Sequence, residues 1–133
     1  MTRQNRKKTA ATELRRAQQA MLAADALARD GLYNDATSRA YYAVFHAACA
    51  LLARLDVHAR THRGVESLLA EHLVAPGRLA SEDLRRFSQV QSQRNIADYG
   101  ADDDITAEQM TVVLADARAF LAAALALQSS LPE

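Results

Sequence analysis

One short segment of the sequence, residues 93–100, combines residue types and a spacing that could do chemistry. It reads Gln-Arg-Asn-Ile-Ala-Asp-Tyr-Gly and places Arg94 four positions before Asp98, so the two side chains can meet on one helix face. Arginine is a natural phosphate ligand because its planar guanidinium donates to two oxygens at once. Asp98 also lies near the expected helix C-terminus, where the helix dipole disfavours a negative charge, which hints at a role beyond stability. The alternative is a surface ion pair of little energetic value, and chemistry alone favours that simpler interpretation.

A second segment, residues 38–46, reads Ser-Arg-Ala-Tyr-Tyr-Ala-Val-Phe-His and gathers three of the seven aromatic residues of the chain within five positions. Aromatic side chains at helical spacing usually fill a core. Tyr41 and Tyr42, however, lie about 100° apart on a helix, so one can face the core while the other faces a groove or a partner. Core packing is therefore the first expectation for this segment, and a partner or dimer surface is the second.

Other common site motifs are missing from the sequence. The four glycines are isolated from one another, which excludes a glycine-rich phosphate loop, and neither a cysteine pair nor a His-Glu-x-x-His motif offers a zinc site. The single cysteine, Cys49, lies in an apolar stretch typical of a small core residue, and it has no partner for an intramolecular disulfide. We therefore expect no metal, no cofactor and a reducing, cytoplasmic location. No apolar run reaches the 18 residues of a membrane span, and we do not expect the basic N-terminus to act as a secretory signal.

Helices must position the two segments, because alanine, leucine and arginine are common and strand signals are nearly absent. Gly31 is expected to end the first helix, because glycine readily adopts the left-handed conformation common just after a helix. The second helix is expected to begin shortly after it. Thr61 and Ser81 are expected to cap the third and fourth helices, and Thr106 with Gln109 predicts a capping box for the last. The five expected helices cover approximately residues 12–30, 33–55, 61–73, 81–99 and 106–129. Short connections then predict a single all-α, up-and-down bundle of four to five helices over residues 12–129, with residues 1–11 forming a basic, frayed N-terminus.

The net charge of zero hides an asymmetry along the chain. Residues 1–63 carry eleven basic and five acidic side chains, whereas residues 64–133 carry five basic and eleven acidic ones. A basic half can attract nucleic acid or an acidic partner. The halves interleave in a folded bundle, however, so solvated helix faces that pair with one another are the simpler expectation.

Three segments together resemble the HEPN domain family, over about residues 12–128. They are Tyr41-Tyr42-Ala43-Val44-Phe45-His46-Ala47, His62-Arg63-Gly64 and Arg94-Asn95-Ile96-Ala97-Asp98-Tyr99. The resemblance implies an up-and-down helical bundle that dimerises, with the arginine motifs of both subunits meeting at a shared cleft. It also implies a role in a toxin–antitoxin-like module, because many members are metal-independent ribonuclease toxins encoded beside a small nucleotidyltransferase that acts as antitoxin.

The sequence departs from that family at one position of the ribonuclease signature, which is an arginine, a polar residue and a later histidine. Arg94 and Asn95 match it, but Tyr99 stands where the histidine is expected. Attack by an RNA 2′-hydroxyl needs a proton acceptor that works near neutral pH, and a free tyrosine, with a pKa of about 10, is about one part in a thousand ionised at pH 7. Tyr99 could instead orient a phosphate or accept a nucleotidyl group from a partner enzyme.

An imidazole could also come from elsewhere in the chain. The sequence places neither His46, His62 nor His72 beside Arg94, so a structural role is the simpler expectation for each. The leading hypothesis is a homodimeric HEPN component of a two-protein module, with catalysis weak or absent and a nucleotidyltransferase as partner. Its phosphate- or RNA-binding cleft would contain Arg94, Asn95 and Tyr99 at the catalytic positions, and Asp98, Tyr42, His46 and His62 as binding residues. The alternatives are an active metal-independent endoribonuclease toxin and a non-catalytic helical adaptor that binds only a protein.

Overall fold

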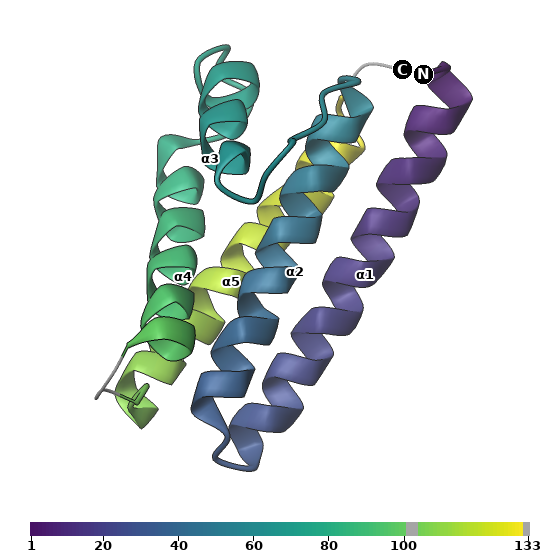
Figure 1. Ribbon diagram of the computed structural model, residues 1–133. Helices are drawn as coiled ribbons and strands as arrows, with labels where there is room; N and C mark the ends of the chain where they lie inside the picture. Colours follow the sequence, from purple (N-terminus) through teal and green to yellow (C-terminus); the bar gives the residue numbers. More distant parts are fainter. Residues whose placement is uncertain (101–103, 132–133) are drawn as a thin grey trace.

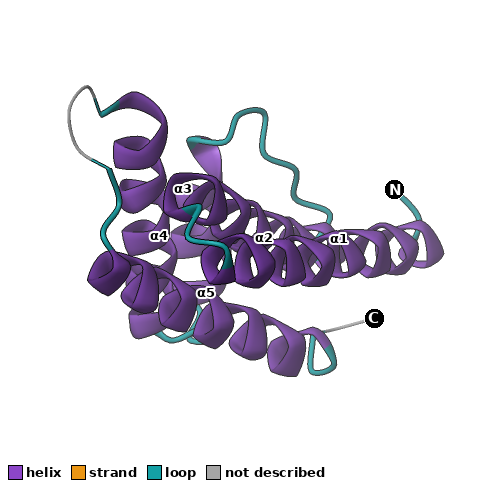
Figure 2. Cartoon of the chain, turned by 90° about the horizontal axis from the view of Figure 1, so that it is seen from below, coloured by secondary structure: helices purple, strands orange, loops and turns teal. Residues whose placement is uncertain are grey.

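The computed structural model describes residues 1–100 and 104–131, and within these residues every regular element is a helix (Figure 2). The elements are α1 (Arg3–Arg29), α2 (Tyr33–Arg54), α3 (Gly64–Leu69), a π-helical turn η1 (Ala70–Val74), α4 (Ser81–Tyr99) and α5 (Ala107–Gln128). The four long helices alternate in direction along the bundle, and α3 with η1 lies at one end of it (Figure 1). This arrangement confirms the predicted all-α helical bundle.

Several helix ends follow the local chemistry that the sequence predicts. Gly31 has a φ of 78° and closes α1 with the paired backbone bonds of a Schellman motif, Leu32 N–H to the Leu27 carbonyl at 2.9 Å and Gly31 N–H to the Ala28 carbonyl at 3.0 Å. At the start of α5, the side chain of Thr106 accepts from the Gln109 backbone while the Gln109 side chain accepts from the Thr106 backbone. The predicted capping box is therefore confirmed.

The start of α1 differs from the prediction. The helix begins at Arg3 rather than near Thr12, and the side chain of Thr2 caps it by accepting the Asn5 N–H at 3.1 Å. The apolar stripe begins only at Leu14, which is why periodicity alone misses the first turns. Ala10 is nevertheless fully buried in a small cluster with Ala50 and Ala53 of α2, so these turns extend the bundle along the end of α2.

Two other helix starts also differ in detail. Ser81 is the first residue of α4 rather than its cap, and the capping position belongs to Ala80, which makes no side-chain bond. The third helix starts at Gly64, three residues after Thr61, although the Thr61 hydroxyl does accept the Gly64 N–H at 3.1 Å. The second half of the predicted third helix is the π-helical turn η1, a geometry that periodicity does not distinguish from an α-helix.

Helix α2 is the central element of the bundle and packs against α1, α4 and α5. Its broad buried face includes Tyr41, whose ring lies 6.4 Å from that of Phe87 in α4. Phe87 in turn lies 5.5 Å from Phe120 of α5, measured between ring centroids. All three rings are fully buried, so a continuous row of aromatic side chains connects α5, α4 and α2 through the core.

Helix α5 is, among the described residues, the one helix long and apolar enough to cross a membrane by length and composition alone. A core helix of a soluble protein meets the same criterion. In this fold α5 buries one stripe against its neighbours, consisting of Met110, Val113, Ala117, Phe120, Leu121 and Ala124.

Candidate functional site

Arg94 lies on the face of α4 that packs towards α2, between two tyrosine rings. Its guanidinium carbon is 5.0 Å from the ring centroid of Tyr41 and 5.7 Å from that of Tyr99, distances at which a cation is attracted to an aromatic face. Its Nε lies 2.8 Å from Asp98 Oδ2, so the predicted contact between these residues is present. The pair is an ionic contact rather than an aligned hydrogen bond, because the buried Nε–H has no acceptor in line.

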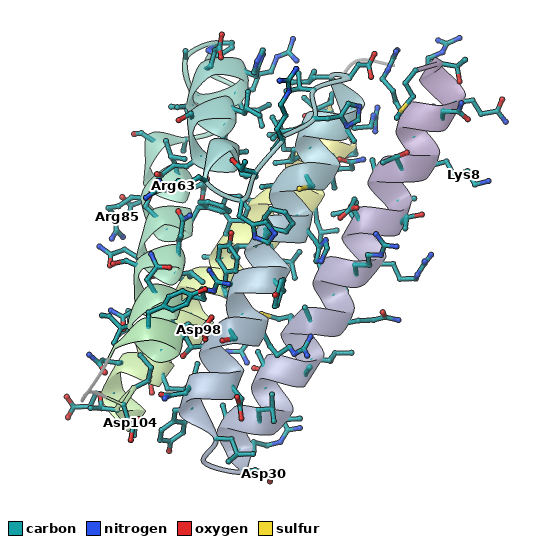
Figure 3. The ribbon with its side chains drawn as sticks, viewed as in Figure 1. Lys8, Asp30, Arg63, Arg85, Asp98 and Asp104 are labelled. Atoms are coloured by element: carbon teal, nitrogen blue, oxygen red, sulfur yellow. The ribbon has the colours of Figure 1, made fainter. Side chains whose placement is uncertain are left out.

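Asp98 is held from a second side by α2. The hydroxyl of Ser38 donates to Asp98 Oδ1 at 2.7 Å, which leaves each carboxylate oxygen with a partner. Figure 3 shows Asp98 on the side of α4 that faces α2, whereas Arg85 points away from the bundle. These two contacts compensate the unfavourable position of a carboxylate near a helix C-terminus, and the carboxylate held in this way contacts Arg94 Nε.

Tyr41 connects Arg94 with His62. The Tyr41 hydroxyl lies 3.2 Å from His62 Nδ1, and the direction of this bond depends on the imidazole tautomer. Burial raises the pKa of Tyr41 to about 12, against the opposing effect of the Arg94 charge, so the phenol is protonated at neutral pH. His62 comes from the loop after α2 and stacks on Phe45 with 4.1 Å between ring centroids. The fold therefore brings the imidazole of His62 to the same tyrosine that supports Arg94.

Tyr42 and His46 occupy a face of α2 next to the one that carries Tyr41. Tyr41 and Tyr42 are consecutive on the helix, about 100° apart, so their different surroundings are as expected. Tyr41 is fully buried, whereas Tyr42 is half-buried and stacks near His46 with 6.3 Å between ring centroids. His46 Nδ1 lies 2.6 Å from Glu13 Oε2 of α1. Tyr42 and His46 line an open groove between α1 and α2 of about 340 Å³. The ring of Tyr42 lies 5.9 Å from that of Tyr41, so this groove borders the residue that supports Arg94, although Arg94 does not line it.

Of the remaining candidates, Asn95 and Tyr99 are exposed at the end of α4, and Tyr99 keeps 74% of its surface accessible. His72 lies in η1 and contacts its neighbour Glu71 at 3.7 Å, outside this cluster. Burial raises the pKa of the Cys49 thiol to about 12, in keeping with a packing role rather than a nucleophilic one. Within the described residues no three His, Cys, Asp or Glu side chains gather as metal ligands.

Sequence reasoning missed two residues that complete the arrangement, Ser38 and Glu13. Their partners lie 60 and 33 positions away, and only the packing of α2 against α4 and α1 brings them together. A faint signal was available for Ser38, because it precedes Tyr41 by three positions and so lies on the same helix face. No comparable signal marked Glu13.

The chain is similar in sequence to several known proteins. A protein from Gloeobacter violaceus named as a UPF0332 protein is 37% identical over 99 residues, covering 74% of this chain and 79% of that protein. A protein from Methanocaldococcus jannaschii named "Putative toxin" is 32% identical over 105 residues, covering 79% and 78%. A second protein of the same name from that organism is 27% identical over 108 residues, covering 81% and 74%. The model of the HEPN domain matches residues 11–127, and the chain belongs to the HEPN domain family.

Proposed function

We propose that this protein is the HEPN component of a toxin–antitoxin-like module and that Arg94 binds RNA phosphate in a cleft shared by two subunits. The observation that carries the proposal is the environment of Arg94. Two aromatic rings and Asp98 hold the guanidinium in place, while its two Nη groups donate no hydrogen bond to another described residue. A pre-positioned guanidinium with free N–H groups suits a phosphate oxygen.

The toxin class is supported by the names of the two Methanocaldococcus jannaschii relatives. The homodimer is supported by the exposed ring of Tyr99 beside Arg94, since a large exposed aromatic next to a binding residue is typical of a surface that a partner covers. In the proposed dimer the Arg94, Asn95 and Tyr99 side chains of both subunits line one cleft. The accessible hydroxyl of Tyr99 is also a suitable point of contact for a nucleotidyltransferase partner.

The proposed phosphate contact predicts that Arg94→Ala weakens binding of single-stranded RNA at least about tenfold, because a charge-assisted contact is lost. Fluorescence anisotropy of a labelled oligonucleotide in EDTA measures this. Arg85→Ala is the matched control, because Arg85 is an exposed arginine of the same helix, paired with Glu82 and pointing away from α2 (Figure 3). Equal weakening by both substitutions would mean that only overall charge matters and would contradict a site at Arg94.

A second candidate function, a metal-independent endoribonuclease, is favoured by one observation. His62 contacts the hydroxyl of Tyr41, the ring of which supports Arg94, and the Nε2 of His62 makes no hydrogen bond within the described residues. If His62 supplies the imidazole missing at position 99, cleavage of total RNA in EDTA is expected to fall about 100-fold or more in His62→Gln. His72→Gln, which changes a histidine outside the cluster, is expected to cleave like wild type. Absence of cleavage by the folded wild-type protein would leave RNA binding as its function.

A further inference from the structure

The groove between α1 and α2 lies beside the Arg94 site but has its own set of side chains. Arg16, Gln19 and Ala20 of α1 form one wall, and Arg39, Tyr42 and His46 of α2 form the other. Its volume of about 340 Å³ is within the range of small-ligand sites, which is about 300–1,000 Å³. No carboxylate lines it, whereas the groove between α4 and α5 is lined by Glu108 and Asp116. The groove is therefore suited to an anionic ligand.

The charges in this groove are only partly neutralised. Arg16 Nη1 lies 3.3 Å from Glu13 Oε1, and the other oxygen of Glu13 contacts His46. The single carboxylate of Glu13, which does not itself line the groove, is therefore shared by two lining residues. Arg39 is exposed and makes no ion pair within the described residues. Its guanidinium lies 5.7 Å from the ring centroid of Tyr42, which keeps it over the aromatic face at the mouth of the groove.

We infer that this groove is a second subsite for single-stranded RNA, in which a base packs against Tyr42 and an adjacent phosphate lies between Arg16 and Arg39. The inference rests on the proposed function, and it adds where the nucleotide next to the Arg94-bound phosphate is held. An aromatic ring beside guanidinium groups is the usual combination in proteins that bind single strands, because every base has a face that can stack. An acidic peptide would use the arginines but would leave the ring without a role.

The position of the groove relative to Arg94 fits neighbouring nucleotides of one strand. The ring of Tyr42 lies 5.9 Å from that of Tyr41, which in turn lies 5.0 Å from the guanidinium of Arg94. Arg39, Tyr42, Tyr41 and Arg94 thus form a row in which each group contacts the next across two adjacent faces of α2 and the end of α4. Because Tyr41 is fully buried, a strand that crosses this row meets the guanidinium of Arg39, the ring of Tyr42 and the guanidinium of Arg94, with the Tyr41 ring beneath them.

The test uses the whole protein and a fluorescein-labelled single-stranded RNA of about ten nucleotides, with anisotropy measured over a range of salt concentrations. Arg39→Gln is expected to weaken binding about fivefold or more and to reduce the slope of log affinity against log salt by about 0.7. Tyr42→Leu is expected to weaken binding about 5- to 100-fold, while Tyr42→Phe, which keeps the ring, stays within about twofold of wild type. Arg15→Gln is the control, because Arg15 precedes Arg16 on α1 but does not line the groove.

The outcomes separate this inference from the proposed function. If Arg94→Ala loses binding while Arg39→Gln and Tyr42→Leu bind like wild type, the groove is not a subsite although the proposed function stands. If wild type does not bind the probe at all, both fail. Displacement of the probe by AMP at an equal concentration would show that a single nucleotide competes as well as a strand does, and would overturn the assignment of the groove to a strand. Arg39 is exposed, so Arg39→Gln reports on binding even where Tyr42→Leu proves unstable.

Discussion

Replacing Tyr41 with alanine is expected to lower the free energy of unfolding by about 3–5 kcal/mol and to abolish RNA binding through Arg94. The ring is fully buried and lies in contact with the rings of Phe45 and Phe87, so its removal leaves a cavity at the centre of the bundle. A loss of this size is a large fraction of the roughly 5–15 kcal/mol that stabilises a typical domain. Urea denaturation followed by circular dichroism measures the first effect, and RNA anisotropy at low temperature measures the second.

Tyr41→Phe is the control that separates the ring from its hydroxyl. The ring remains beneath the Arg94 guanidinium, while the contact with His62 Nδ1 is lost. We expect a cost of about 1 kcal/mol in stability and RNA binding close to that of wild type. RNA binding by Tyr41→Ala at wild-type affinity, in protein shown to be folded, would contradict the role of this ring in positioning Arg94.

Phe120→Ala is expected to destabilise the protein as much as Tyr41→Ala, by about 3–5 kcal/mol, yet to leave RNA binding intact below its unfolding midpoint. Phe120 is fully buried in α5 and packs on Phe87, which packs on Tyr41, so Phe120 is two rings further from Arg94 than Tyr41. The same two measurements apply. Comparison of Tyr41→Ala with Phe120→Ala distinguishes a general loss of stability from a local loss of the Arg94 site. Failure of folded Phe120→Ala to bind RNA would show that stability and RNA binding cannot be separated in this way.

Much of the fold was predictable because it depends on short-range chemistry. Apolar residues three and four positions apart predicted the helices, Gly31 closed α1 as expected, and Thr106 with Gln109 formed the predicted capping box. The predicted start of α1 was wrong because the first turns of the helix bury only alanine, notably Ala10. Alanine carries too little apolar signal to extend the stripe of apolar residues. The π-helical turn η1 was missed because it shares the side-chain pattern of an α-helix.

The candidate site was predictable only where its residues share a helix. The four-residue spacing predicted the contact of Arg94 with Asp98, and the one-residue spacing predicted different surroundings for Tyr41 and Tyr42. The position of His62 depends on the path of the loop after α2, for which the sequence carries no periodic signal. Contacts between helices, such as that of Ser38 with Asp98, require the orientation of α2 relative to α4, which only the assembled core defines.

Native mass spectrometry of the protein mixed with a short single-stranded RNA tests most directly whether two chains bind RNA in one shared cleft. We predict a complex of two chains and one RNA strand for wild type, and a dimer without RNA for Arg94→Ala. A complex of one chain with one strand, or an Arg94→Ala dimer that retains the RNA, would contradict the shared cleft at Arg94.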